Sequence, residues 1–201
     1  MYILITGCTG VGKTTFANLI ASTYDSVKVL QEPFDHNPYI EDSYRDTEHW
    51  GLHSQLFFLS QFYKQHTFIK QEKGNIVQER SVFECAEIFI KYYFKIGKML
   101  KRDRDLFMEI YDILENSITR KPDLIFYLKA SAHSLLSRVK KRGRDFEKYI
   151  TYELLDIQNS LYEEWIQKIG DSIPVIQIDV DEHDLLNDPQ DILELLKTLK
   201  L

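Results

Sequence analysis

Short apolar runs alternate along the chain with longer segments whose apolar residues recur at helical spacing. The runs at 2–6, 27–30, 75–78, 123–128 and 174–178 are β-branched or otherwise apolar, which is typical of buried parallel strands. Helical patterns fill the intervals at 13–24, about 45–72, 82–97, 103–120, 131–142, 149–169 and 188–199. This order predicts an α/β fold with a doubly wound, five-stranded parallel sheet flanked by helices, whose ligands bind beyond the carboxyl ends of the strands.

Composition narrows the class of protein. The 201 residues, 44% of them hydrophobic, suffice for one packed core, and no repeat or Pro/Gly-rich linker divides the chain, so we expect a single domain over 1–201. A formal net charge of −6 disfavours a nucleic-acid surface. The sequence shows no signal peptide and no apolar run of the roughly 18 residues that a membrane helix needs. With only two cysteines, Cys8 and Cys85, we expect a cytoplasmic protein that binds neither nucleic acid nor membrane.

A glycine-rich loop, GCTGVGKT, follows the first predicted strand. Its Gly-x4-Gly-Lys-Thr pattern lets the backbone wrap around phosphate with its N–H groups pointing inward, at the positive end of the next helix. The lysine would contact the β and γ phosphates of ATP, and the Thr14 hydroxyl would take a Mg²⁺ position. The loop residues predicted to bind the nucleotide are Gly7, Cys8, Thr9, Gly10, Val11, Gly12, Lys13, Thr14 and Thr15.

Charged residues follow the next three strands, at the same predicted edge of the sheet. Glu32 follows the second strand, and Glu79 with Arg80 follows the third. An arginine-rich segment follows the fourth and predicts a short lid at about 138–148, whose guanidinium groups would stabilise a transferring phosphoryl group. Taken singly, these residues also fit a solvated turn acid, a surface ion pair and a basic helix end. Their common position beside a phosphate loop favours the functional interpretation.

At these residues the chain resembles the deoxynucleoside kinases, which include deoxycytidine, deoxyguanosine and deoxyadenosine kinases and mitochondrial-type thymidine kinases. The resemblance covers nearly the whole chain, and its size and Asn-Pro-Tyr stretch are similar to the bacterial branch. The residues that carry it, besides the phosphate loop, are Glu32-Pro33, Asn37-Pro38-Tyr39, Ser43-Tyr44-Arg45-Asp46, Gln55, Glu79-Arg80-Ser81, and Arg138 to Arg144 with Glu147. It implies a P-loop kinase fold and transfer of the γ-phosphoryl group of ATP to the 5′-hydroxyl of a deoxynucleoside.

The resemblance also implies a role for each matching residue. Glu32 would be the general base, and Arg80 would hold both Glu32 and the acceptor hydroxyl. Tyr44 and Glu147 would bind the sugar 3′-hydroxyl, and Gln55 would bind the base through its amide. The groups expected on the donor side are Arg138, Arg142 and Arg144 at the phosphates, Thr14 and Glu79 at Mg²⁺, and Asp179, Val180 and Asp181 near the adenine.

Two positions depart from the deoxycytidine and deoxyadenosine kinase pattern. Many relatives bracket the base with an arginine seven residues after the glutamine and an aspartate six after the third-strand acid, but here Phe62 and Cys85 occupy these places. Losing both charges together is chemically consistent, because either alone would lack its partner. We therefore expect Phe62 and Cys85 to line a more apolar and broader base pocket. A register shift of one turn would instead place Gln61, Tyr63 or Lys64 there.

Two other functions remain open from the sequence. A monophosphate kinase of the thymidylate kinase type shares these motifs but needs arginines for the acceptor phosphate, and none lies between Asp46 and Glu79. A regulatory P-loop ATPase has little use for an arginine lid. Because relatives dimerise through helices in this region, the excess apolar positions at 82–94 and 110–118 also predict a homodimer.

Overall fold

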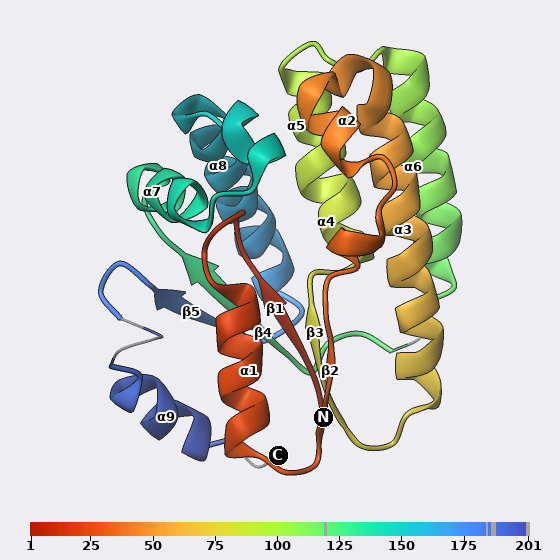
Figure 1. Cartoon of the computed structure of the whole chain (residues 1–201). Coiled ribbons are helices and arrows are strands. Elements are labelled where there is room, and N and C mark those ends of the chain that lie inside the picture. Colours follow the sequence, from red (N-terminus) through yellow and green to blue (C-terminus); the bar gives the residue numbers. More distant parts are fainter. Residues whose placement is uncertain (119, 184, 186–187, 200–201) are drawn as a thin grey trace.

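The computed structural model describes residues 1–118, 120–183, 185 and 188–199. Five parallel strands form one sheet in the order β2-β3-β1-β4-β5 (Figure 1). The strands are β1 (Tyr2–Thr6), β2 (Val27–Leu30), β3 (Asn75–Glu79), β4 (Leu124–Lys129) and β5 (Val175–Asp179). The predicted fold class is confirmed, and each strand lies within one residue of its predicted bounds.

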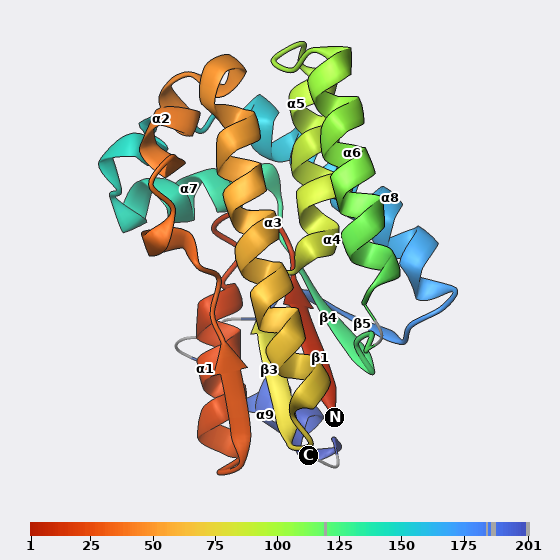
Figure 2. The ribbon, with the colours of Figure 1, turned by 90° about the vertical axis from the view of Figure 1, so that its right-hand side faces the viewer.

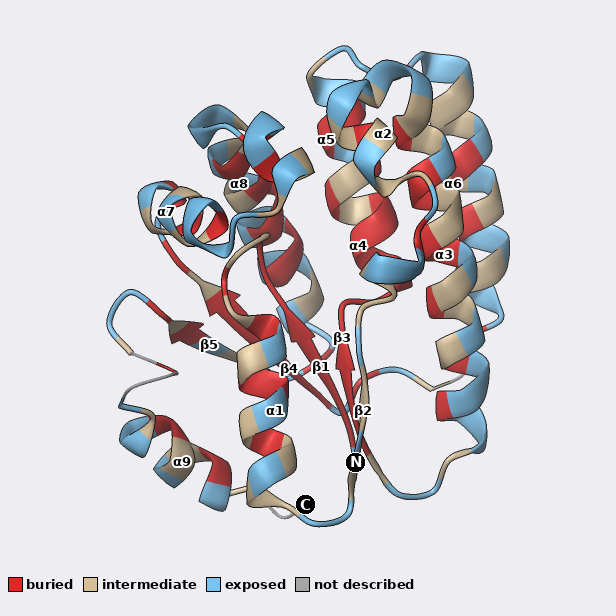
Figure 3. Cartoon of the chain, viewed as in Figure 1, coloured by how far each residue is buried: buried red, intermediate tan, exposed pale blue. Residues whose placement is uncertain are grey.

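Helices cover both faces of the sheet because neighbouring strand residues point to opposite sides. Phe126 of β4 packs on Phe16 of α1, with ring centroids 4.9 Å apart, whereas Tyr127 stacks on Tyr162 of α8 at 6.2 Å. The strands β1 and β4 are almost wholly buried between these layers (Figure 3). The helices are α1 (Lys13–Thr23), α2 (Ile40–Arg45), α3 (Thr47–Gln71), α4 (Val82–Glu84), α5 (Lys91–Lys95), α6 (Lys101–Asn116), α7 (Ala132–Arg142), α8 (Tyr152–Gly170) and α9 (Gln190–Lys197).

Two helices depart from the predicted pattern. The helix predicted at about 45–72 is confirmed as α3, which Asp46 caps by accepting from the His49 backbone N–H at 3.3 Å, but the short helix α2 that precedes it was not predicted. The helix predicted at 82–97 contains a π-helical stretch, Cys85–Ile90, between α4 and α5. Such stretches occur often at functional sites. Position 119, inside the helix predicted at 103–120, lies outside the described residues.

The segments that follow the strands gather at one end of the sheet. In Figures 1 and 2, α2 and α7 both lie beyond the carboxyl ends of the strands, with α3 and α6 side by side to one side of the sheet. Two short 3-10 turns, Phe34–His36 and Asp145–Tyr149, belong to the same end. Among the described helices, none has the length and hydropathy needed to cross a membrane.

Candidate active site

The phosphate loop joins β1 to α1 in a conformation that requires glycine. Gly7 has a φ of 139°, and a Cβ there would lie 2.2 Å from the carbonyl oxygen of Leu128. Gly12, with a φ of 107°, is the N-cap of α1, so the helix N-terminus faces the loop. Lys13 lies over the loop, with Nζ donating to the carbonyl oxygens of Gly7 at 2.8 Å and Cys8 at 3.1 Å. Burial lowers the pKa of Lys13.

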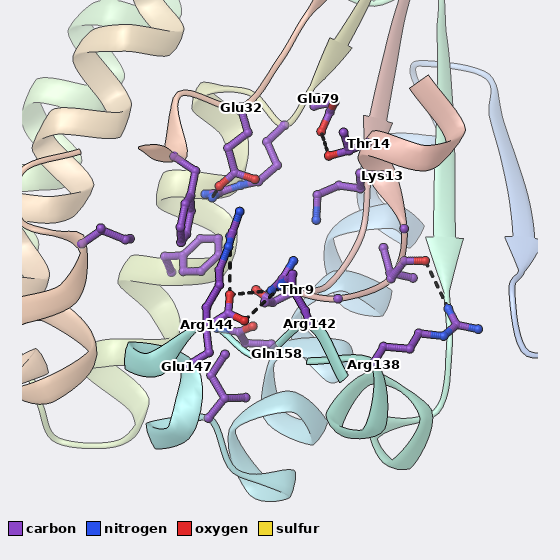
Figure 4. Close-up of a pocket in the computed structure, with 18 of the residues that line it drawn as sticks. Thr9, Lys13, Thr14, Glu32, Glu79, Arg138, Arg142, Arg144, Glu147 and Gln158 are labelled. Atoms are coloured by element: carbon purple, nitrogen blue, oxygen red, sulfur yellow. Dashed lines mark hydrogen bonds and ion pairs between the residues drawn. The ribbon is translucent and has the colours of Figure 1, made fainter. Parts of the chain in front are cut away.

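A cavity of about 870 Å³ opens over this loop (Figure 4). The predicted phosphate, acceptor, lid and adenine-side residues line it from seven separate segments of the chain, which is the convergence that the sequence predicts. The predicted residues that line it are Thr9, Gly10, Val11, Gly12, Lys13, Thr14, Thr15, Glu32, Tyr44, Gln55, Glu79, Arg80, Arg138, Arg142, Arg144, Glu147, Val180 and Asp181. Gly7, Cys8 and Asp179 do not line it; burial raises the pKa of the Cys8 thiol to about 12 and keeps it protonated.

Glu32 and Arg80 form a buried ion pair in this cavity. Arg80 Nη1 donates to Glu32 Oε1 at 2.5 Å, and the two side chains are 5% and 18% exposed. The guanidinium carbon lies 4.2 Å from the ring centroid of Phe89 and 5.1 Å from that of Phe58. These aromatic rings restrict the plane of the guanidinium.

Glu79 faces the phosphate loop from the end of β3. Its Oε2 accepts from the Thr14 hydroxyl at 2.7 Å, whereas its Oε1 is buried with no partner among the described residues. Burial raises the pKa of Glu79, although the Thr14 hydrogen bond acts in the opposite direction. A buried, unpartnered carboxylate oxygen beside a threonine hydroxyl matches the oxygen ligands that Mg²⁺ prefers.

The lid arginines contact other groups than the sequence predicted. Arg142 binds the buried carboxylate of Glu147 through two hydrogen bonds of 3.0 and 2.5 Å, and Arg144 lies 3.6 Å from the same carboxylate (Figure 4). Arg138 donates to the backbone carbonyls of Val11 at 3.3 Å and Val180 at 2.7 Å. The predicted convergence therefore holds for the cavity, but Arg138 lies at the donor end, away from Glu32.

The base side of the cavity is aromatic. Burial raises the pKa of Tyr44, so its hydroxyl stays protonated and can donate to a sugar. Gln55 Nε2 donates to the Tyr93 hydroxyl at 3.4 Å, and its buried Oε1 has no partner among the described residues.

The expectation that Phe62 and Cys85 line this pocket is wrong. Both side chains are fully buried and lie outside the lining of the cavity, whereas Phe89 of the π-helical stretch lines it.

The alternative one-turn register is excluded as well. Gln61, Tyr63 and Lys64 do not line the cavity. The lining residues Phe58, Phe89, Tyr93 and Gln158 are not among the predicted site residues. A signal for Phe58 was present, since it lies three residues after Gln55 on the same helical face. Nothing in the sequence singled out Gln158 on α8.

A phosphate loop facing a carboxylate-arginine pair, under a lid rich in arginine, defines this molecule as a P-loop phosphotransferase. The family model described as deoxynucleoside kinase matches residues 3–200. The chain belongs to the deoxynucleoside kinase family, whose activity is ATP-dependent phosphorylation of a deoxynucleoside.

Known relatives span the full length of the chain. It is 32% identical over 191 residues to the deoxyadenosine/deoxycytidine kinase of Bacillus subtilis, covering 94% of this chain and 87% of the relative. It is 34% identical over 197 residues to the deoxyadenosine kinase of Dictyostelium discoideum, covering 98% and 78%. A structure of deoxyadenosine kinase from M. mycoides, with dCMP and dCDP bound, superposes with a TM-score of 0.87 at 28% identity, covering 99% of this chain and 100% of that chain.

Proposed function

We propose that Glu32 is the general base with which this kinase transfers the γ-phosphoryl group of ATP to the 5′-hydroxyl of a deoxyribonucleoside. The observation that carries this assignment is the buried pair of Glu32 and Arg80 in the same cavity as the phosphate loop. A carboxylate at this place can accept the proton of an attacking hydroxyl. The adjacent guanidinium keeps the Glu32 carboxylate oriented until the hydroxyl arrives.

The donor phosphates would lie along the loop, with Lys13 at the β and γ groups. Arg138 would close the donor end, because it is anchored to the carbonyls of Val11 and Val180 on either side of that end. Arg142 and Arg144 would reach the transferring group from the lid while retaining their contact with Glu147. Positioning and charge stabilisation of this kind account for most of the catalysis of phosphoryl transfer.

Thr14 and Glu79 are the residues that would hold Mg²⁺, and Glu79 Oε1 is the buried oxygen left free for it. When bound, the ion would neutralise charge on the β and γ phosphates. The contribution of the chain is to keep both oxygens in place at the end of β3 and the start of α1.

The acceptor site would bind a deoxyribose and a base of several kinds. Tyr44 and Glu147 would hold the 3′-hydroxyl, and the tyrosine ring leaves little room around the sugar. Gln55 would supply both a donor and an acceptor to the base edge. The wall beside Gln55 is formed by aromatic side chains, Phe58, Phe89 and Tyr93, and the Arg80 guanidinium that lies against Phe58 and Phe89 is paired with Glu32, which supports a broad base preference.

An acceptor panel tests this proposal. All four deoxynucleosides, their monophosphates and the ribonucleosides are offered with ATP and Mg²⁺, and product is quantified by chromatography. We expect turnover of several deoxynucleosides, weak turnover of ribonucleosides and none of monophosphates. Preference for a monophosphate would indicate the thymidylate kinase type of reaction. ATP consumption without an acceptor would indicate an ATPase. Strict use of one deoxynucleoside would refute the broad base pocket.

The assembly and location of the protein are further parts of the proposal. We infer a single-domain, cytoplasmic enzyme that acts as a homodimer. Both cysteines are free and buried, which suits a reducing compartment. The exposed apolar residues Leu106 and Ile113 on α6, 52% and 66% exposed, suit a subunit contact. Light scattering that gives a monomer would reject the dimer.

A further inference from the structure

A buried carboxylate, Glu84, takes no part in the transfer proposed above. It is 0% exposed and does not line the cavity. Ionisable side chains are rarely buried to this extent unless they are paired or fully hydrogen-bonded. Its position at the end of α4, four residues after Arg80, raises the question of what it holds.

Three donors satisfy the Glu84 carboxylate. The Ser81 backbone N–H and hydroxyl donate to Oε2 at 2.8 and 2.6 Å, and the Thr6 hydroxyl donates to Oε1 at 2.6 Å. The contacts to Ser81 form a capping box that begins α4. Thr6 is the last residue of β1 and precedes Gly7 of the phosphate loop. A single carboxylate therefore joins the start of the phosphate loop to the turn after β3.

That turn carries Arg80 in an unfavourable backbone conformation. Arg80 has a φ of 57°, and among the described residues it is the one non-glycine residue with positive φ. A side chain in this left-handed region persists only where its surroundings hold it there. The Arg80 N–H is held by the carbonyl of Ile5 at 3.0 Å on one side of the residue, and Ser81 is held by Glu84 on the other.

The side chain of Arg80 cannot hold its own direction. Nη1 donates to Glu32, but Nε and Nη2 are buried with no hydrogen-bond partner in the part of the chain that the structure describes. Aromatic rings around the guanidinium restrict its plane but accept no directed hydrogen bond. The aim of the guanidinium therefore depends on the backbone turn from which it starts.

We propose that Glu84 is a positioning residue that aims Arg80 at the transferring phosphoryl group by locking the left-handed turn of Arg80 to the end of β1. The effect is geometric and passes through Ser81 and Thr6. Glutamine can replace glutamate here, because one amide oxygen accepts both Ser81 contacts while the amide nitrogen donates to the Thr6 hydroxyl. This inference rests on the proposed role of Arg80, and the experiment separates the two.

A double-mutant cycle between Glu84→Ala and Arg80→Lys tests the proposal. We expect Glu84→Ala to lower kcat on the order of tenfold to a hundredfold, since small misplacements of a catalytic group have effects of this size. The KM for ATP should stay within about threefold, because the phosphate loop keeps its own contacts. In the Arg80→Lys background, Glu84→Ala should cause no further loss of kcat, whereas Glu84→Gln in the native background should restore kcat to within about threefold.

Tyr2→Phe provides a matched control on the same strands. The Tyr2 hydroxyl is a buried donor to Gln78 Oε1 at the opposite end of β1, and its removal should lower the unfolding midpoint but not kcat. Should Glu84→Ala fail to fold, Thr6→Val enters the same cycle, because it leaves the capping box intact. Equal losses of kcat in both backgrounds, or an unchanged kcat with a lower unfolding midpoint, would overturn the role of Glu84. An unaffected kcat in Arg80→Lys alone would instead overturn the role of Arg80.

Discussion

Replacing Glu32 by glutamine removes the proposed base while leaving the shape of the active site almost unchanged. The amide oxygen can still accept from Arg80 Nη1, where the carboxylate oxygen now lies at 2.5 Å. The proton of the 5′-hydroxyl then has no acceptor of suitable basicity. We expect kcat to fall at least about a hundredfold, which corresponds to about 2.7 kcal/mol in the activation barrier.

A second effect of this substitution acts on stability. Arg80 is 4% exposed, and Glu32 is the one carboxylate in ion-pair contact with it among the described residues. Losing the charge of the partner while keeping one hydrogen bond should destabilise the fold by about 1–3 kcal/mol. The two effects are separable, because the loss of kcat is measured well below the unfolding midpoint.

A coupled assay of ADP release gives kcat, and calorimetric titration with a non-hydrolysable ATP analogue gives donor affinity. Affinity should be retained, since Lys13 and the loop backbone keep their own contacts in the variant. Glu41→Gln, an exposed position on α2 outside the cavity, is the matched control and should behave as the native protein. Turnover of the Glu32→Gln protein within about threefold of native would refute the assignment of the base.

Three further changes follow from the same geometry. Arg142→Gln should raise the KM for the deoxynucleoside about tenfold by releasing the buried Glu147 carboxylate, and a rise in the KM for ATP alone would contradict this. Gly7→Ala should lower the free energy of unfolding by more than ~2 kcal/mol and abolish ATP binding. Gly97 has a φ of 70°, and an added Cβ would meet nothing within 4 Å, so Gly97→Ala should lower the free energy of unfolding by about 1 kcal/mol and keep activity. Burial lowers the pKa of His66, so below the unfolded pKa of about 6.5 the unfolded chain binds a proton that the folded chain does not. The free energy of unfolding should therefore decline as the pH falls through this value. In His66→Gln the unfolding midpoint should depend less on pH between about pH 7 and 5.

The sheet and most helices were predictable because their signals are local. A buried parallel strand is a continuous apolar run, and the helix after the phosphate loop begins at its last glycine, so residues within a few positions decide both. The short helix α2 was missed because its six residues are too few to show a helical pattern, whereas α3 begins within two residues of its predicted start. The π-helical stretch was missed because it adds one residue to a turn without changing which residues are apolar.

The site residues that lie at strand ends could be predicted from their motifs. The residues whose place in the cavity depends on which face of a helix they occupy could not. Glu32, Glu79 and Arg80 follow directly from the strand order, since parallel strands end at one edge. The resemblance to the family placed Phe62 and Cys85 in the pocket, but both side chains are fully buried outside its lining, and Phe89 lines it. Spacing fixes distance along a helix, whereas the face that reaches a cavity depends on local winding and on tertiary packing.

The lid links the two substrate sites through charge. Glu147, proposed to hold the acceptor sugar, also anchors Arg142 and Arg144, proposed to reach the donor phosphates. Arg144 further lies over the ring of Phe34 at 4.5 Å and 3.8 Å from the Asp35 carboxylate, both on the acceptor side. A lid held in this way does not depend on phosphate to stay near the cavity, because its arginines are already paired. The charge of the lid arginines becomes fully available to a phosphoryl group when the sugar hydroxyl takes over part of the hydrogen bonding of Glu147. Acceptor binding should therefore raise the affinity for the donor. Donor binding should raise the affinity for the acceptor by the same factor.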